Sequence, residues 1–296
     1  MGTYRLTETF LPAPRAGYAG EDVAPAGRCP RLGAVRVTSL GYLTDVALRV
    51  LEGAEVTDRG DYLVVRTADN PAFWWGNFLL LAAWPGAGTG DSWLARFGAE
   101  FPLARHLALG VDSPGEDGGM MPAEFSAAGL ELRRDTVLTC AAVQPPPHPS
   151  AAAEIRRLES DADWRQSADL GVRCFGDDGS QDYQARRAAA RRRLTQRGRA
   201  AWFGAFAGGR LLAQLGLVDA GGGYARYQHV ETDPAARRQG LAGTLVWQAG
   251  QYGCEVLSAG TFVIVADPAD VAIRVYRSCG FADLQSQVSF ERPSGE

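Results

Sequence analysis

The stretch ETDPAARRQGLAGTLVW, from Glu231 to Trp247, joins the end of a strand to the start of a helix. Pro234 suits a turn or a first helical position, and the chain from Arg237 enters a helix expected to run to about Gly253. The first turn of a helix carries free backbone N–H groups and about half a positive charge. The small residues Gly240, Ala242 and Gly243 let a ligand approach the backbone closely. The two arginines, at 237 and 238, add positive charge. The stretch therefore predicts a site for a phosphate or pyrophosphate.

The composition is that of a globular protein long enough for two domains. The chain has 296 residues, of which 46% are hydrophobic and 22% are charged. Its formal net charge of −4 argues against a general nucleic-acid binder, which is usually basic, and weakly favours cationic ligands. All 30 basic residues are arginine, which excludes Schiff-base chemistry and a P-loop lysine.

The sequence predicts no metal site, membrane span or secretion signal. His106, His148 and His229 lie far apart, and no cysteine or histidine has zinc-ligand spacing. No run approaches the ~20 apolar residues of a membrane span, and the N-terminus has no apolar signal core. The five scattered cysteines are expected to be reduced thiols. We therefore expect a cytoplasmic protein.

The stretch QPPPHPS, from Gln144 to Ser150, divides the chain, because consecutive prolines favour an extended spacer. It predicts domains over residues 1–143 and 151–296, joined by a linker over 144–150. Hydrophobic patterning and turn residues predict the elements of the second domain. These are helices over 163–174, 181–196 and 271–278, and strands over 201–206, 211–218, 224–232, 261–266 and 281–290.

The helix expected over residues 181–196 is rich in arginine. Such a run binds phosphates in some proteins, but it is more often a solvated helix face. We expect the solvated face for all five arginines of its central part, which are Arg186, Arg187, Arg191, Arg192 and Arg193.

The first half contains an eroded copy of the second. An offset of 151 residues aligns FSAAGLELRRDTVL, which begins at Phe125, with YRSCGFADLQSQVS, which begins at Tyr276. The same offset aligns residues 76–85 with 227–236 and residues 91–97 with 242–248. One offset that serves three elements indicates a duplication. The first copy carries PGAGTGD, with no basic residue, in place of the arginine run.

Arg237, Gly240 and Ala242 fit the pattern Arg/Gln-x-x-Gly-x-Gly/Ala, and this stretch resembles motif A of the GCN5-related N-acetyltransferase (GNAT) superfamily. DVAIRVYRSCGF, from Asp270 to Phe281, resembles motif B, although Asp270 stands where that family often has asparagine. The resemblance implies an α/β fold of two GNAT-like domains. Each would be a mixed, mostly antiparallel twisted sheet flanked by helices, and the first would be a degenerate domain without a motif A loop.

The resemblance implies acetyl-CoA, or another acyl-CoA, as cosubstrate and no metal. In this family the pantetheine arm lies between the fourth and fifth strands, and the pyrophosphate sits on the amides of the motif A loop. The residues that the resemblance assigns to the cofactor are Val230, Glu231, Thr232, Arg237, Arg238, Gln239, Gly240, Leu241, Ala242, Gly243, Thr244, Asp270 and Tyr276.

The implied reaction is direct acyl transfer from the thioester to a primary amine. Tyr276 matches the family's tyrosine that protonates the departing CoA thiolate. A general base or a water chain must deprotonate the amine. Strand alternation places Tyr227, His229 and Glu231 on one face, so His229 and Glu231 are the candidate bases. The alternatives are a hydrogen-bonded sheet histidine and a carboxylate that only complements the helix start.

The expected acceptor is a small-molecule amine, and neither nucleic acid nor a membrane is an expected partner. Within the aromatic stretch from Asn70 to Pro85, Trp75 and Asn77 are candidate substrate contacts, and most of the other aromatics are expected in the core. The first half is expected to shape the acceptor cleft or to replace the second subunit of a dimer. The sequence is consistent with a monomer whose two domains mimic a dimer and with a homodimer. Two alternative functions also remain: acyl transfer to a hydroxyl, and a non-catalytic acyl-CoA sensor or scaffold.

Overall fold

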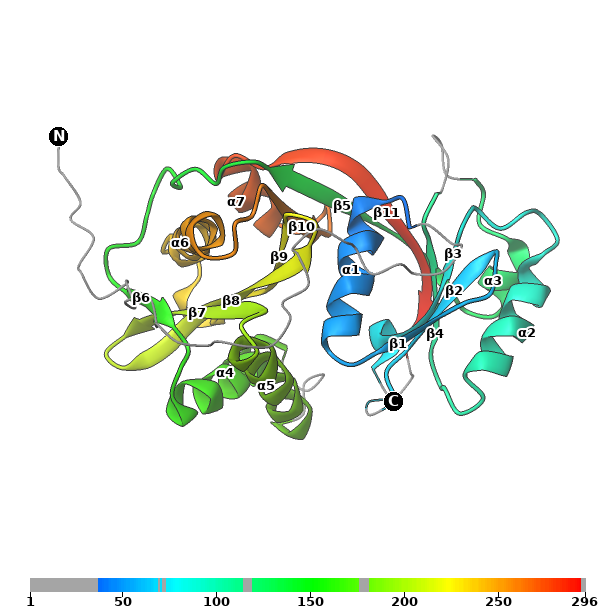
Figure 1. The fold of residues 1–296 in the computed structure, drawn as a ribbon, viewed down its shortest axis with the longest axis horizontal. Coiled ribbons are helices and arrows are strands. Elements are labelled where there is room, and N and C mark those ends of the chain that lie inside the picture. Colours follow the sequence, from blue (N-terminus) through cyan, green and yellow to red (C-terminus); the bar gives the residue numbers. More distant parts are fainter. Residues whose placement is uncertain (1–36, 69, 71–72, 114–118, 176–180, 294–296) are drawn as a thin grey trace, which may run out of the picture.

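The computed structural model describes residues 37–68, 70, 73–113, 119–175 and 181–293. Its strands form one eleven-stranded sheet, in the order β1-β2-β3-β4-β11-β5-β10-β9-β8-β7-β6. Only the pairs β3–β4 and β9–β10 are parallel, and helices flank the sheet (Figure 1). This confirms the predicted α/β class, with a mostly antiparallel sheet flanked by helices.

The helices and strands of the two halves follow one another in similar order. The first half contains α1 (Leu40–Leu51), β1 (Glu55–Asp58), β2 (Tyr62–Arg66), η2 (Trp74–Gly76), β3 (Asn77–Leu81), α2 (Gly90–Glu100), β4 (Leu107–Val111), α3 (Ala123–Ala127) and β5 (Glu131–Cys140). The second half contains β6 (Glu154–Arg157), α4 (Asp161–Phe175), α5 (Gln181–Gln196), β7 (Ala200–Ala207), β8 (Arg210–Gly221), β9 (Tyr224–Thr232), η4 (Pro234–Ala236), α6 (Leu241–Glu255), β10 (Thr261–Ala266), α7 (Ala272–Ser278) and β11 (Ala282–Arg292).

The duplication inferred from the sequence is visible in these bounds. Helix α2 begins at Gly90 and α6 at Leu241, and strand β5 begins at Glu131 and β11 at Ala282. Both pairs differ by the predicted 151 residues. Each half also contains one parallel strand pair, β3–β4 in the first and β9–β10 in the second.

The two halves exchange their last strands. Strand β5 of the first half pairs with β10 of the second, and β11 of the second half pairs with β4 of the first. The two exchanged strands also pair with each other, with Glu131 opposite Glu291 at one end and Thr139 opposite Ala282 at the other. In Figure 1 they bridge the two halves. The division at residues 144–150 stays a prediction, and the exchange, which crosses it, was not predicted.

Helix α1 of the first half closes one face of the second-half sheet. Its Leu48 packs in the same buried cluster as Trp164 of α4 and Trp202 of β7. Arg226 of β9 is buried beneath α1, where it donates hydrogen bonds to Thr44 Oγ1 at 2.7 Å and to Asp45 Oδ1 at 2.9 Å. The opposite face of this sheet packs against α6 and α7. Residues of the first half therefore border β9 directly.

We predict that neither half folds alone, because each half by itself lacks the strand of the other half that covers one of its strand edges. A fragment over residues 37–143 lacks β11 beside β4, and a fragment over 151–296 lacks β5 beside β10. Circular dichroism should show no cooperative melting for either fragment, and mixing the two should restore it. A single fragment that is monomeric and melts cooperatively would contradict the exchange.

Candidate functional site

Strands β9 and β10 diverge at the predicted cofactor site. They pair only where residues 224–226 of β9 face residues 261–263 of β10. From Tyr227 to Thr232, β9 is paired with β8 on its other edge. Its backbone N–H and C=O groups on the β10 side therefore have no partner strand within the described sheet. Such an edge binds an extended ligand through main-chain hydrogen bonds.

A β-bulge interrupts β9 in the same segment. Gln214 of β8 faces Glu231 and Gly216 faces Gln228, so two residues of β9, including His229, oppose one residue of β8. His229 has a left-handed backbone with φ +52°. A bulge re-aims the side chains that follow it, because it shifts the alternation by one residue.

The bulge overturns the prediction that Tyr227, His229 and Glu231 share one face. Tyr227 packs into the core with α6, and its hydroxyl donates to the Val246 carbonyl at 2.7 Å. His229 and Glu231 instead contact side chains of α5 on the opposite face. The two candidate bases thus stay together, but Tyr227 lies on the other side of the sheet.

The turn after β9 leads into an uncapped helix start. Arg238 has φ +61° and Gly240 has φ +75°, both left-handed, and α6 begins at Leu241. Gly240 supplies no side-chain cap, so the first-turn N–H groups are open to another acceptor. Arg237 and Arg238 are exposed beside this turn. These features fit the predicted pyrophosphate cradle.

The proline-rich linker lies against this helix start, and in Figure 1 it passes from β5 over α7 and α6 towards β6. A Cβ atom at Gly240 would lie 2.3 Å from the His148 carbonyl oxygen. The Ser150 N–H donates to Thr244 Oγ1 at 2.8 Å. Any side chain at position 240 would therefore displace the linker backbone. The linker is therefore packed against the predicted cradle and is not only a spacer.

Tyr276 of α7 borders the same region. It is 6% exposed in the core cluster of α6 and α7. Burial, and to a smaller degree the Asp270 carboxylate, raises the pKa of Tyr276 well above its ordinary value, so the hydroxyl stays protonated. The Tyr276 hydroxyl makes no hydrogen bond with any other described residue. Asp270 itself accepts the Ala272 N–H at 2.9 Å at the start of α7.

Glu231 and His229 differ in what holds them. Glu231 is 5% exposed, and its two oxygens bond to Arg191 Nη2 at 3.2 Å and to Gln214 Nε2 at 2.6 Å. His229 is more accessible, and its Nδ1 lies 2.6 Å from Arg187 Nη2. Burial, together with the nearby arginines, holds the pKa of His229 well below its ordinary value, so the ring is neutral at pH 7. Their roles as bases stay predictions.

The expected solvated face of α5 is wrong for Arg191, which is 3% exposed. Arg187 and Arg192 are partly buried, and Arg186 and Arg193 are exposed. The reason is the ion pair with Glu231, which draws Arg191 towards the sheet. Arginine burial of this kind depends on a partner from another strand, which local sequence does not reveal.

Trp75 and Asn77 occupy structural positions in the first half. Asn77 is 3% exposed, and its amide bonds the backbone of Thr67, Asn70 and Phe73. Trp75 Nε1 donates to Glu291 of the exchanged strand β11 at 2.9 Å. Their predicted contact with a substrate stays a prediction, and the side-chain amide of Asn77 already bonds the backbone at both its oxygen and its nitrogen.

A carboxylate stands beside the helix start of the first half. A Cβ atom at Gly90, where α2 begins, would lie 3.0 Å from Glu124 Oε2. A carboxylate is favourable at a helix N-terminus and repels a phosphate. This gives a physical reason, beyond the missing arginines, why the first copy is not expected to hold a pyrophosphate.

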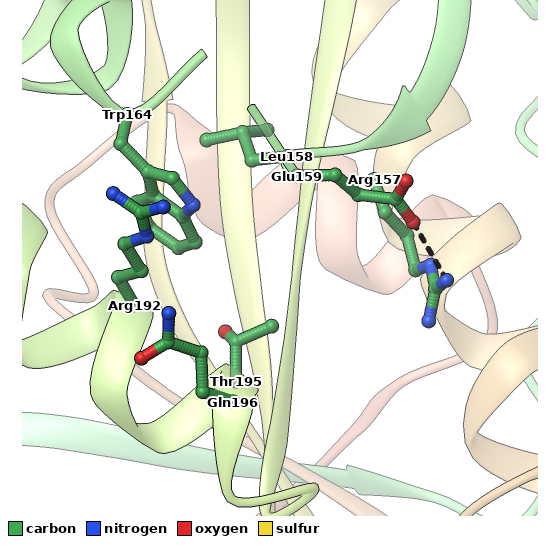
Figure 2. Close-up of a pocket in the computed structure, with 7 residues that line it drawn as sticks. All are labelled: Arg157, Leu158, Glu159, Trp164, Arg192, Thr195 and Gln196. Atoms are coloured by element: carbon green, nitrogen blue, oxygen red, sulfur yellow. Dashed lines mark hydrogen bonds and ion pairs between the residues drawn. The ribbon is translucent and has the colours of Figure 1, made fainter. Parts of the chain in front are cut away.

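Two shallow hollows lie away from the predicted cofactor site. One is lined by the residues drawn in Figure 2, which come from β6, the turn after it, α4 and α5, and there Arg157 and Glu159 pair with each other at 2.7 Å. The other lies in the first half beside Trp84 and Trp93. Neither contains a residue predicted to bind cofactor or substrate, and Arg157 is already neutralised by its partner.

The described residues contain no group of three or more His, Cys, Asp or Glu arranged to hold a metal ion. None of their helices has the length and apolar character needed to cross a bilayer. Four cysteines among them, Cys140, Cys174, Cys254 and Cys279, are free thiols, and Cys29 lies outside the described residues.

Residues 160–281 match the acetyltransferase (GNAT) family. This part of the chain belongs to that family. No curated protein matches the chain by sequence. The family assignment made from motifs A and B is confirmed, and it covers β9, the cradle and α7.

Solved structures resemble nearly the whole chain. A GCN5-related N-acetyltransferase from Kribbella flavida is 17% identical with a TM-score of 0.59, over 87% of this chain and 98% of its own. A conserved protein of unknown function from Staphylococcus epidermidis is 11% identical with a TM-score of 0.63, over 82% and 95%. A tandem GNAT protein from the clavulanic acid biosynthesis pathway is 16% identical with a TM-score of 0.50, over 86% and 94%. At these identities the likeness shows the fold alone.

We predict that Thr244→Val loosens the linker. The change removes the acceptor of the Ser150 N–H and the hydroxyl that donates to the Gly240 carbonyl at 2.9 Å, while the side-chain volume stays similar. The free energy of unfolding should fall by about 1–2 kcal/mol in denaturant titrations. Thr244→Ser keeps the hydroxyl and is the matched control. Equal stability of Thr244→Val and wild type would show that this contact does not hold the linker.

Proposed function

We propose that the chain transfers an acetyl or other acyl group from acyl-CoA to a primary amine of a small molecule, at a site in its second half. The match to the GNAT family supports acyl transfer in general. One observation carries the finer proposal: the unpaired edge of β9 leads directly into the uncapped start of α6. A ligand that combines an amide-rich arm with a pyrophosphate fits that arrangement.

The residues around this edge have distinct proposed roles. The backbone of Val230 to Thr232 would bond the pantetheine arm. The N–H groups from Arg238 to Thr244 would hold the pyrophosphate, with the exposed guanidinium groups of Arg237 and Arg238 adding charge. The linker at His148 and Ser150 borders this turn and would contact the bound cosubstrate.

The proposed reaction forms a bond between the amine nitrogen and the acyl carbon and breaks the bond between that carbon and sulfur. His229 is neutral and partly exposed, and it accepts the amine proton, directly or through water, at the ring nitrogen that Arg187 contacts. Arg187 must release that nitrogen before the proton is transferred. The unpaired amides of β9 stabilise the oxyanion that forms on the acyl oxygen. Tyr276 gives its proton to the departing thiolate and regains one from solvent. Glu231 is bonded at both oxygens and positions Arg191.

The cofactor cradle is tested at Ala242, because a substitution at Gly240 would also displace the linker. Ala242→Glu adds a negative charge in the first turn of α6, where a carboxylate favours the helix but repels a phosphate. Calorimetry should show one acetyl-CoA per wild-type chain and an affinity about tenfold to a hundredfold lower for Ala242→Glu, from about 1–3 kcal/mol of repulsion.

Ala242→Gln, of the same size without the charge, should bind almost as the wild type does. Equal affinity of the Glu and Gln variants would contradict the cradle. If acetyl-CoA binds but no free CoA is released when amines or alcohols are offered as acceptors, the non-catalytic acyl-CoA sensor is favoured instead.

Tyr276→Phe should lower kcat for acyl transfer on the order of 10²-fold, because it removes the proton donor to the thiolate. The ring stays in the core and no hydrogen bond between described residues is lost, so melting temperature and acetyl-CoA affinity should hold. Tyr252→Phe on α6 is the matched control and should keep wild-type kcat. An unchanged kcat for Tyr276→Phe would remove Tyr276 from the mechanism.

A further inference from the structure

Four arginines gather on the face of β9 that is turned away from α6. They come from three elements: Arg49 of α1, Arg187 and Arg191 of α5, and Arg226 of β9. Three are paired with carboxylates, namely Arg49 with Glu52, Arg191 with Glu231 and Arg226 with Asp45. Arg187 has no ion pair with any carboxylate among the described residues.

Arg187 is instead held by neutral groups. Its Nη2 lies 2.6 Å from His229 Nδ1, and its Nη1 donates to Gln184 Oε1 at 3.4 Å. Its guanidinium carbon lies 5.8 Å from the Phe175 ring centroid and 5.5 Å from that of Tyr183. Burial, and then the repulsion from Arg191, lowers the pKa of Arg187 to about 10. Among the described residues, the Glu231 carboxylate therefore compensates the Arg187 cation only in part.

The pair of Arg187 and His229 is within reach of a ligand. The side chain of His229 is 26% exposed, and Phe175 beside Arg187 is 46% exposed. His229 also lies in the bulge of β9, on the segment whose other edge has no partner strand. A molecule held at Arg187 therefore lies next to the strand proposed to carry the acyl group.

We propose that Arg187 binds a carboxylate of the acceptor, so that the acceptor is an amino acid or another amine with a carboxylate close to its amino group. This rests on the function proposed above. The planar guanidinium offers paired N–H donors that match a carboxylate. It also abuts the ring nitrogen of His229, so one ligand reaches both groups. The bound carboxylate compensates Arg187, and His229 becomes more basic when the acceptor is in place.

The test uses matched ligands that bind without turnover. N-acetylglycine, N-acetylleucine and N-acetylphenylalanine are each compared with their carboxamides, with CoA in excess so that ordered binding is not missed. Binding to the full chain is followed by NMR through the His229 imidazole signal, which is identified with His229→Gln. We expect at least one acid to bind about tenfold to a hundredfold more tightly than its carboxamide and to raise the pKa of His229.

Two variants assign that preference. Arg187→Gln should abolish the preference for the acid, whereas Arg186→Gln, an exposed arginine on the same helix, should keep it. The inference is overturned if acids and carboxamides bind equally, if no acid binds, or if Arg187→Gln retains the preference. Inorganic phosphate that competes as tightly as the best acid would also overturn it, in favour of a general anion site.

The two proposals fail separately. Acetyl-CoA binding by calorimetry with no preference for acids overturns the acceptor class and leaves acyl transfer standing. Preference for acids at Arg187 with no acetyl-CoA binding leaves the carboxylate site standing and overturns the acyl transfer.

Discussion

The antiparallel ladder between β5 and β11 joins the two halves into one sheet, and the form of the site follows from it. Because β5 lies beside β10, the chain that leaves β5 passes at once over α7 and the start of α6. The same pairing brings α1 onto the opposite face of β9, where Asp45 compensates Arg226. The linker therefore borders the proposed cradle on one side, and α1 of the first half borders the opposite face of β9.

The duplication has left two helix starts with opposite electrostatics. In the second half, Gly240 leaves the first turn of α6 uncapped and two exposed arginines stand beside it. In the first half, the Glu124 carboxylate stands beside the start of α2. A pyrophosphate is attracted to the first arrangement and repelled by the second. A difference of a few side chains at one turn would therefore suffice to leave only the proposed site of the second half.

Local features of the chain were predictable, and contacts between distant residues were not. Apolar runs such as TFVIVA and stop signals such as Gly280 placed β10 and the end of α7, because they depend on nearby residues alone. The exchange of β5 and β11 was hidden because the two strands are copies of each other, so either pairing satisfies the same pattern. The bulge at His229 carries no glycine to mark it, and the burial of Arg191 depends on Glu231. The whole-chain charge of −4 also pointed to cationic ligands, whereas the charge beside His229 is positive.

The central claim is that the second half holds one acyl-CoA site, on the unpaired edge of β9 and the start of α6. Amide hydrogen exchange of the full chain, with and without acetyl-CoA, tests it most directly, because it reports every backbone N–H at once. We expect slower exchange with acetyl-CoA at residues 230–232 and 238–244, and no change at residues 86–90 of the first half. Protection at residues 86–90, or no protection at either segment, would contradict the claim.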